Sequence, residues 1–315
     1  MDSIIVEGLA KYYGDLCAVD HVSFTVEAGE VFGYLGPNGA GKTTTIRMLT
    51  GLTRPSEGRA WVAGYDVIEE TLEVKRRIGV VPEASNLYDE LTVWENLEFI
   101  SRLYHVPRAE RHKRIRELLK LFDLWDRRDS RFRRLSRGLK RRAVLAAALV
   151  NDPEILFLDE PTTGLDVVSA RSLRGLVNRL REMGKTIFLT THYIEEADQL
   201  CDRVAIIVRG RIRAIDTPEN LKLKAGVKSI LEVELSDSPP ASLLERLRGL
   251  EVEVEGRQLR VHTDNPQMLL RILTEEVGRS GLTLLSLRSR SPTLEDAFIK
   301  LTGLSPEVMR REKGV

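Results

Sequence analysis

The chain has 315 residues, which is enough for one large domain or for two of ordinary size, each with its own core. Its 48 Lys and Arg nearly balance its 47 Asp and Glu, which excludes an overall field that would favour nucleic acid or a membrane surface. The two cysteines, Cys17 and Cys201, are far apart in sequence, which favours two buried thiols in a reducing compartment. No apolar run approaches the roughly 20 residues that span a bilayer, so we expect a cytoplasmic chain.

Four short apolar runs between residues 31 and 208 lack the alternation of a strand that has one wet face. In chain order they read VFGYLG, ILFLD, TIFLTT and RVAIIV. Longer segments with helical periodicity separate them, most clearly at 167–183, where Gly184 supplies a C-terminal stop. This pattern predicts an α/β core around a parallel sheet, with the ligand at the carboxyl ends of the strands.

The first apolar run leads into a glycine-rich loop, LGPNGAGKTTT, at residues 35–45. Gly36, Gly41, Lys42 and Thr43 have the spacing of a phosphate-binding P-loop between a strand and a helix. Glycines let backbone N–H groups approach phosphate oxygens, and the start of a helix adds partial positive charge. We expect Lys42 to reach the β and γ phosphates of a nucleoside triphosphate and the Thr43 hydroxyl to hold Mg²⁺.

Residues 91–150 are predicted to be a helical insertion, because they contain about sixty residues of helical pattern and no convincing strand. Within it, the signature segment, LSRGLKRR at 135–142, begins a helix for which Ser136 is a good N-cap. Its free N–H groups form a second anion site. One triphosphate does not need two such sites, so we expect the second to serve the nucleotide of another molecule.

Polar side chains follow the next two apolar runs. Asp159 is the last residue of the run ILFLD, and Glu160 follows it directly. Burying two unpaired carboxylates costs free energy, so two acids at this place indicate a function. We expect Asp159 to support Mg²⁺ through water and Glu160 to act as the general base for the attacking water. His192 follows TIFLTT, and its position at the same sheet edge favours a role in sensing or orienting the γ phosphate.

The texture of the sequence changes after Ile215. Strand-like runs at 230–235, 251–255, 258–263 and 282–287 alternate with helical stretches at 242–248 and 266–280. That βαββαβ order predicts a small α+β, ferredoxin-like second domain.

Five motifs together make the chain resemble the ATP-binding cassette of ABC transporters over residues 1 to about 220. They are GPNGAGKTT, the signature segment, ILFLDEP, the TGLD segment at 163–166 and TTH at 190–192. The resemblance implies ATP and Mg²⁺ as cofactors and a head-to-tail dimer in which each ATP lies between the P-loop of one chain and the signature segment of the other. The loop residues implied in nucleotide binding are Gly36, Pro37, Asn38, Gly39, Ala40, Gly41, Lys42, Thr43 and Thr44.

The resemblance also implies roles for residues outside the P-loop. Ser136 and Gly138 would contact the γ phosphate of the partner's ATP, and Asp166 would link the two sites. Tyr13 matches the aromatic residue that stacks on adenine, with Tyr12 as an alternative. Lys42, Glu160 and His192 would be the catalytic side chains.

Two positions depart from the family pattern. The signature commonly reads LSGGQ, whereas Arg137 replaces its first glycine here; because Ser136 and Gly138 are kept, we expect the phosphate contact to survive. Glu83 stands where the family usually has glutamine. A carboxylate binds Mg²⁺ more strongly than an amide, so Glu83 joins Thr43 and Asp159 as an expected metal ligand.

The resemblance divides the chain into a cassette at 1–225, with a helical subdomain at about 86–150, and an accessory domain at 226–315. The segment SPTLEDAFIKLTG at 291–303 resembles the accessory domain of daunorubicin-resistance-type drug exporters. The expected function is an ATPase subunit that powers a separately encoded membrane permease, on the inner face of the cell membrane. Its expected partners are a second cassette, giving a homodimer, and permease subunits that contact the region around LTVWENLEF, including Leu87 and Tyr88.

Other classes of protein fit the sequence less well. A non-transport cassette ATPase acting on the ribosome or nucleic acid is the main alternative, and the basic stretch 127–142, with nine Arg or Lys, invites it. Phe132, Leu135 and Leu139 within that stretch instead indicate a packed segment, so no nucleic-acid partner is expected. A GTPase would show an Asn-Lys-x-Asp element, which is absent from the sequence.

Overall fold

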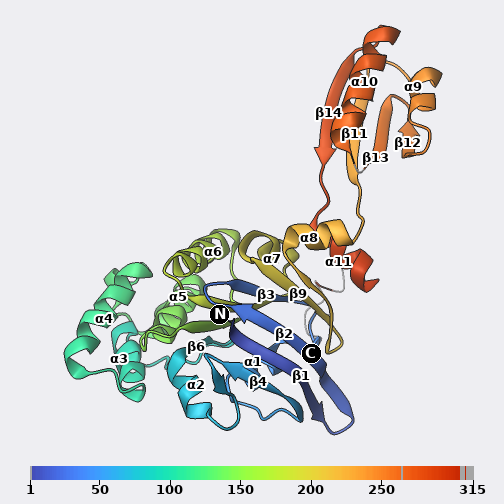
Figure 1. The fold of residues 1–315 in the computed structure, drawn as a ribbon. Coiled ribbons are helices and arrows are strands. Elements are labelled where there is room, and N and C mark those ends of the chain that lie inside the picture. The colour runs from blue at the N-terminus through green and yellow to red at the C-terminus, as the bar shows by residue number, and fades with distance from the viewer. Residues whose placement is uncertain (1, 264, 306–308, 310–315) are drawn as a thin grey trace. The chain divides into compact units, whose positions relative to one another are not determined.

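The computed structural model describes residues 2–263, 265–305 and 309, which divide into two compact units. The first unit extends to Pro218 and takes in the described residues Leu304, Ser305 and Met309, and the second is Glu219–Gly303. The border falls before residue 226, where we expected the second domain to begin, because most of helix α8 (Pro218–Lys224) groups with the second unit. Figure 1 shows the elements of both units.

The larger sheet of the first unit has six strands in the order β10-β9-β3-β8-β7-β6. All neighbouring pairs are parallel except β10 and β9 at the edge. Every residue of β3, β7 and β8 is buried, as expected for strands covered on both faces, so the predicted α/β core is confirmed. The strands are β3 (Val31–Leu35), β6 (Ile78–Val81), β7 (Ile155–Asp159), β8 (Thr186–Thr191), β9 (Arg203–Val208) and β10 (Arg211–Asp216).

A second sheet, antiparallel and ordered β2-β1-β4-β5, is not predicted by the apolar runs. Its first strand pairs with β2 through register shifts between Val6 and Leu9 and again between Leu9 and Lys11. Such irregularities break the alternation of inward and outward side chains, which removes the periodic signal of a half-buried strand. The strands are β1 (Asp2–Tyr13), β2 (Leu16–Glu27), β4 (Glu57–Val62) and β5 (Tyr65–Asp66).

Helices connect the strands of the first unit. The predicted helix at 167–183 is observed as α6, and the predicted insertion contains three helices and two short 3₁₀ turns. Thr92 and Glu95 form a capping box that begins α3. No helix in the described ranges combines the length and apolar character needed to cross a membrane. The helices are α1 (Lys42–Leu49), α2 (Thr71–Arg77), α3 (Val93–Leu103), α4 (Arg108–Leu121), α5 (Arg137–Ala148), α6 (Val167–Glu182) and α7 (Ile194–Leu200).

The second unit has the βαββαβ order that the sequence predicts. Its four strands are ordered β12-β13-β11-β14, and every neighbouring pair is antiparallel, which is the ferredoxin-like arrangement. Helix α11 follows the last strand. The elements are β11 (Ser229–Leu235), α9 (Ala241–Arg246), β12 (Glu251–Glu255), β13 (Gln258–Thr263), α10 (Pro266–Ser280), β14 (Leu284–Arg290) and α11 (Leu294–Thr302).

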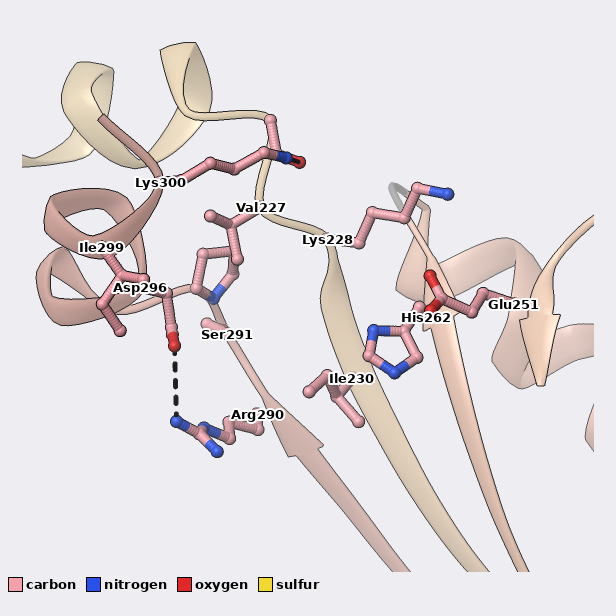
Figure 2. Close-up of a pocket in the computed structure, with 12 residues that line it drawn as sticks. Val227, Lys228, Ile230, Glu251, His262, Arg290, Ser291, Asp296, Ile299 and Lys300 are labelled. Carbon is pink, nitrogen blue, oxygen red and sulfur yellow. Dashed lines mark hydrogen bonds and ion pairs between the residues drawn. The ribbon is translucent and has the colours of Figure 1, made fainter. Parts of the chain in front are cut away.

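A cavity of about 460 Å³ lies in the second unit, and the residues that line it fall between Gly226 and Lys300. Figure 2 shows Lys300 of α11 on one side of it and His262 of β13 on the other. Several of its charges are already paired: Arg290 contacts Asp296 at 3.7 Å, and the Lys300 amine donates to a backbone carbonyl at 2.8 Å. The cavity therefore has mixed charge and belongs to the second unit, Glu219–Gly303, which is called the accessory unit below.

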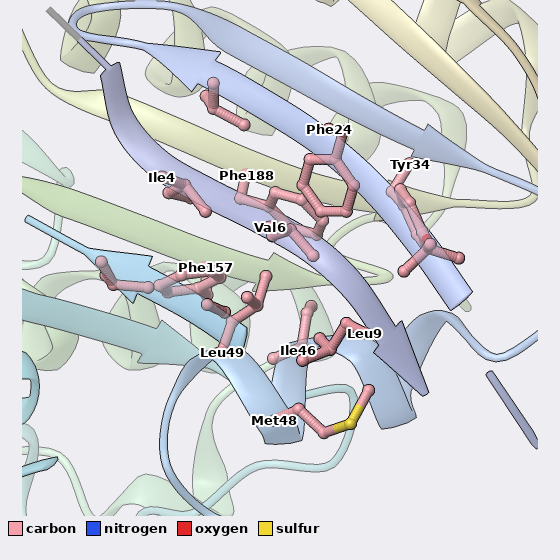
Figure 3. Packing of buried hydrophobic residues seen from close by; sticks show 14 of the residues in the cluster. Ile4, Val6, Leu9, Phe24, Tyr34, Ile46, Met48, Leu49, Phe157 and Phe188 are labelled. Carbon is pink, nitrogen blue, oxygen red and sulfur yellow. The ribbon is translucent and has the colours of Figure 1, made fainter. Parts of the chain in front are cut away.

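The core of the first unit draws on both of its sheets and on α1 (Figure 3). Phe24 of β2 stacks on Phe32 of β3 with ring centroids 5.4 Å apart, and Phe188 of β8 lies 5.6 Å from Phe157 of β7. Ile46 of α1 belongs to the same buried cluster. Because α1 is anchored by this core, the loop that precedes it is held at a defined place beside the strand ends.

The expectation of two buried thiols is correct for Cys201 and wrong for Cys17. Cys201 is buried, and its sulfur packs so closely on Gly33 that a Cβ there would lie 2.6 Å away. Burial raises the pKa of the Cys201 thiol, which keeps it protonated. Cys17 is only partly buried, because it lies beside the turn that joins β1 to β2, near the end of the hairpin.

Candidate functional site

The glycine-rich loop connects β3 to α1, and packing alone requires glycine at two of its positions. At Gly36 a Cβ would lie 2.2 Å from the carbonyl oxygen of Ile207. Gly41 has a φ of +103°, and a Cβ there would lie 2.4 Å from the carbonyl oxygen of Ala18. The rest of the predicted loop is Pro37, Asn38, Gly39 and Ala40, followed by Lys42, Thr43 and Thr44 in the first turn of α1.

Lys42 is a buried cation that the loop folds around. Its Nζ donates to the carbonyl oxygens of Gly36 at 2.6 Å and Pro37 at 3.1 Å. The same nitrogen lies 3.0 Å from Oε1 of Glu160, and both side chains are about 5% exposed. The positive charge at the P-loop and the negative charge at the end of β7 thus neutralise one another.

Glu160 also contacts His192, so three predicted catalytic side chains come together. His192 follows β8, and its Nδ1 lies 2.7 Å from Oε2 of Glu160. The Thr163 hydroxyl donates to the same carboxylate oxygen at 3.1 Å. Glu160 has a φ of +48°, an unfavourable region for a residue with a side chain, and its N–H donates to the Thr190 carbonyl at 3.1 Å.

The two neighbouring carboxyl groups have pKa values shifted in opposite directions. Burial would raise the pKa of Glu160, but the contacts with His192 and Lys42 outweigh it and lower the pKa below its usual value. For Asp159, burial dominates and raises the pKa, although the Thr190 hydroxyl donates to it at 2.6 Å. Glu160 is therefore the carboxylate that stays ionised most readily.

Two of the three expected metal ligands lie together. The Thr43 hydroxyl is close enough to Asp159 to lower the pKa of that carboxyl, whereas the Glu83 side chain is exposed. In the described part of the chain, no group of three or more His, Cys, Asp or Glu could hold a metal ion by itself. Thr43 and Asp159 fit a magnesium ion that takes its other oxygens from phosphates and water, which is the coordination Mg²⁺ prefers with nucleotides.

The signature segment begins α5 as expected. Ser136 is the N-cap, and its hydroxyl accepts from the N–H of Leu139 at 3.4 Å. Gly138 has a packing role of its own, because a Cβ there would lie 2.7 Å from the hydroxyl oxygen of Ser169 on α6. Glycine at this position thus permits close contact between two helix N-termini.

The signature segment and the TGLD segment of the same chain are in contact. Arg137 donates to the carbonyl oxygen of Gly164 at 2.7 Å. Asp166 is the N-cap of α6 and accepts from the N–H of Ser169 at 2.8 Å, an interaction that lowers the pKa of its carboxyl. Arg137 thus joins the start of α5 to the loop that begins α6.

The predicted adenine-stacking residues lie at the end of β1. Tyr13 is 46% exposed, and Tyr12 is 36% exposed. The Lys11 amine lies 5.2 Å from the centre of the Tyr13 ring. Of the two rings, Tyr13 is the one with more of its surface available for stacking.

One buried residue of this region is missing from the sequence prediction. Arg141 of α5 is 8% exposed, and its guanidinium contacts backbone carbonyls at the end of β7 and just after β6 and β7. From the sequence alone, Arg141 is one of nine basic residues in the stretch 127–142. Helical spacing is the available signal, because Arg141 lies on the same face of α5 as the buried Val144 and Leu145.

Comparison with known proteins matches the part of the chain that contains the P-loop, the signature segment and Glu160. A family model described as ABC transporter matches residues 19–163. The Nod factor export ATP-binding protein I of Ralstonia nicotianae is 40% identical over 298 residues, which is 95% of this chain and 93% of that protein. The daunorubicin resistance ATP-binding protein DrrA3 of Streptomyces coeruleorubidus is 40% identical over 303 residues, covering 96% of each chain.

A solved structure supports the same fold. It is a dimeric, post-hydrolysis state of the ATP-binding cassette MJ0796 bound to ADP and Pi, with a TM-score of 0.62 and 28% sequence identity. The similarity covers 68% of this chain and 98% of that one. The matched length is that of the cassette, whereas the two sequence relatives align with nearly the whole chain, including the accessory unit.

Proposed function

Because the chain belongs to the ABC transporter family of ATP-binding proteins, we propose that it is the ATP-hydrolysing subunit of an exporter. Two relatives, aligned over at least 95% of this chain, are named for Nod factor export and daunorubicin resistance. This supports export of a drug, lipid or other hydrophobic compound. It does not support action on the ribosome or on nucleic acid.

ATP would bind with its phosphates on the loop 36–41 and the first turn of α1. Backbone N–H groups and the helix end provide positive potential there, and Lys42 adds a full charge. Thr43 and Asp159 would hold Mg²⁺, which supplies charge neutralisation at the β and γ phosphates. Tyr13 would stack on the adenine, and Glu83 would contribute to the metal site only if its exposed side chain turned inward.

The chain of contacts from Lys42 through Glu160 to His192 is the observation that carries the proposed hydrolysis. At 3.0 and 2.7 Å, these contacts place a base between a cation and an imidazole. A nucleotide that attracts Lys42 would weaken its ion pair with Glu160 and leave that carboxylate available to accept a proton from water. His192 would then orient Glu160 and the γ phosphate.

The chain would work as a homodimer in which each ATP contacts both copies. Ser136, Gly138 and Asp166 lie at two adjoining helix N-termini, which suits an anion supplied by a partner. Val167 and Val168 follow directly and are 81% and 78% exposed. A second copy would cover this apolar pair next to the predicted phosphate contacts.

A membrane permease would bind the first unit at residues outside the proposed ATP site. A cavity of about 590 Å³ is lined by the exposed side chains of Leu72, Leu103 and Tyr104 together with charged residues that include Lys75, Arg76 and Glu110. Tyr88 is also exposed, but Leu87 is buried, so Leu87 supports the loop and is not itself a contact. Through this partner the chain would be held on the inner face of the cell membrane, and co-purification with the permease would test the assignment.

The substitution Glu160→Gln tests the proposed activity. It should lower ATP turnover by on the order of 10² to 10⁴, because the amide cannot take a proton, while ATP binding remains. The variant should then accumulate as an ATP-bound dimer in light scattering. Glu182→Gln, at the exposed end of α6, is the matched control and should behave as wild type.

A companion variant separates binding from catalysis. Lys42→Ala removes the charge at the P-loop and should weaken nucleotide binding in a fluorescence titration. Normal turnover in Glu160→Gln would overturn the assignment of the base, and normal affinity in Lys42→Ala would overturn the assignment of the phosphate site.

A further inference from the structure

Arg141 joins α5 to two other segments through its guanidinium alone. Its Nε donates to the carbonyl oxygen of Pro161 at 2.8 Å, and one terminal nitrogen donates to that of Asp159 at 2.8 Å. The other terminal nitrogen contacts the carbonyl oxygen of Pro82 and, at 3.4 Å, that of Glu83. Every one of these acceptors is a backbone atom, so the contacts define where the segments lie.

The surroundings of Arg141 explain why it remains a cation. Burial lowers the pKa of its guanidinium to about 10, and nearby carboxylates, chiefly Asp159, Glu196 and Glu83, favour the charged form. A buried charge without a direct carboxylate partner contributes little to the net stability of the fold. It is tolerated only when its N–H donors all form hydrogen bonds. The planar fork of arginine satisfies several carbonyls at once, which a lysine ammonium cannot do in the same geometry.

The three segments belong to two different parts of the proposed machinery. Asp159 and Pro161 flank the base Glu160, and Pro82 and Glu83 form the loop after β6. Arg141 itself lies one helical turn after Ser136 and Gly138, which face the nucleotide of the partner in the proposed dimer. The Arg141 side chain therefore contacts the backbone of the ATP site in its own chain. Through helix α5 it is also joined to Ser136 and Gly138, which would contact the ATP bound by the partner.

We propose that Arg141 is a positioning residue that couples the two ATP sites of the dimer, by making the signature segment move with the strand ends of its own nucleotide site. The proposal rests on the proposed function, because the second site exists only in a head-to-tail dimer. A change around Asp159 and Glu160 when Mg²⁺ and ATP bind would shift the carbonyls that Arg141 holds. The start of α5 would move with these carbonyls, and this movement would position Ser136 and Gly138 for the ATP of the partner.

The substitution Arg141→Lys tests this coupling because it keeps the charge and removes the fork. We expect ATP affinity of the single chain to stay within about twofold of wild type, since the P-loop is untouched. Maximal turnover should fall about tenfold, and the Hill coefficient for ATP should fall from above 1 to 1. Arg134→Lys is the matched control, because Arg134 is exposed in the same basic stretch, and it should keep both quantities.

Wild-type turnover and cooperativity in Arg141→Lys would overturn the proposal, as would a wild-type Hill coefficient of 1. A second measurement needs no variant, in case Arg141→Lys fails to fold. Hydrogen exchange of the wild-type chain, at a dilution where light scattering detects only single chains, should change at 82–88 and at 136–140 together when a non-hydrolysable ATP analogue and Mg²⁺ are added. A change confined to 82–88 would show that the signature segment does not follow.

Failure of the proposed function gives a different result. If Glu160→Gln with an otherwise wild-type sequence forms no dimer with ATP, the head-to-tail arrangement is wrong, whatever Arg141 does. If that dimer forms and Arg141→Lys shows undiminished cooperativity, only the coupling role is wrong.

Discussion

Glu196 is a buried carboxyl group beside the strand ends that carry the proposed catalytic residues. It lies on α7, is 1% exposed, and has its pKa raised by burial, which the Thr191 and Thr162 hydroxyls offset only in part. Between the unfolded pKa of about 4.3 and the raised folded value, the folded chain binds more protons than the unfolded chain. Stability from this group is therefore present at low pH and is lost as pH rises through the folded pKa.

The substitution Glu196→Gln should remove this pH dependence. Near pH 4 the variant and the wild type should unfold at the same temperature, because the wild-type carboxyl group is neutral there. At pH 8 the variant should have a Tm higher by about 2–4 °C. Thermal unfolding followed by circular dichroism from pH 4 to pH 8 measures the difference, and a gap that does not widen with pH would contradict it.

The sequence predicts which residues gather at the site better than it predicts how they touch. Lys42, Glu160 and His192 each follow or adjoin a recognisable strand, so their presence at one sheet edge could be expected. The direct ion pair between Lys42 and Glu160 could not, because it depends on which strands lie nearest to the P-loop. Arg141 was missed because its role depends on carbonyls from loops distant in sequence.

At the scale of elements, the contact between α5 and the loop before α6 is a feature of this particular sequence. Arg137, which replaces the usual glycine, donates to the Gly164 carbonyl across that contact. Because the carbonyl acceptor is uncharged and the Arg137 side chain is exposed, we expect this hydrogen bond to contribute only modestly to the free energy of unfolding. Arg137→Ala should lower the free energy of unfolding by about 0.5–1.5 kcal/mol.

Urea unfolding of Arg137→Ala measures this change, with Arg134→Ala as the control from the same basic stretch. We expect ATP turnover to change less than tenfold, because Ser136 and Gly138 remain as the proposed phosphate contacts. An unfolding free energy equal to that of wild type would mean that the contact with Gly164 contributes no stability. A larger loss of turnover would mean that Arg137 acts on the nucleotide itself.

The elements that the sequence predicts well are those with an uninterrupted pattern. The strands β3, β7, β8 and β9 are continuous apolar runs, and α6 keeps its helical spacing throughout. The antiparallel sheet escapes prediction because β1 changes register twice near Gly8, a glycine in the left-handed region with φ +57°. A regular strand gives a period-2 pattern because its side chains alternate between the two faces of the sheet. A bulge adds a residue, so the alternation shifts and the pattern is interrupted after a few residues.

At the scale of the whole molecule, the accessory unit folds around its own apolar core. Leu231 of β11, Leu259 of β13 and Leu273 of α10 are all buried within it. The two relatives align over at least 95% of this chain, so the alignments take in the accessory unit as well as the cassette. In β11 and β13 every second residue is buried along most of the strand, a period-2 pattern that the sequence also shows.

The dependence of turnover on concentration tests the whole molecule at once. If each ATP site needs residues from two copies, the fraction of active sites falls as the chains separate, so turnover per chain should decrease in proportion to concentration once most chains are single. The exposed pair Val167 and Val168 offers apolar area that a second copy would cover.

Steady-state ATP hydrolysis over a thousandfold dilution, with light scattering at each concentration, measures this dependence. Turnover per chain that stays constant while scattering finds no pair would mean that one copy completes the site alone. In that case the second anion site at Ser136 would have no nucleotide to serve, and Gly138 would be explained by its packing against Ser169.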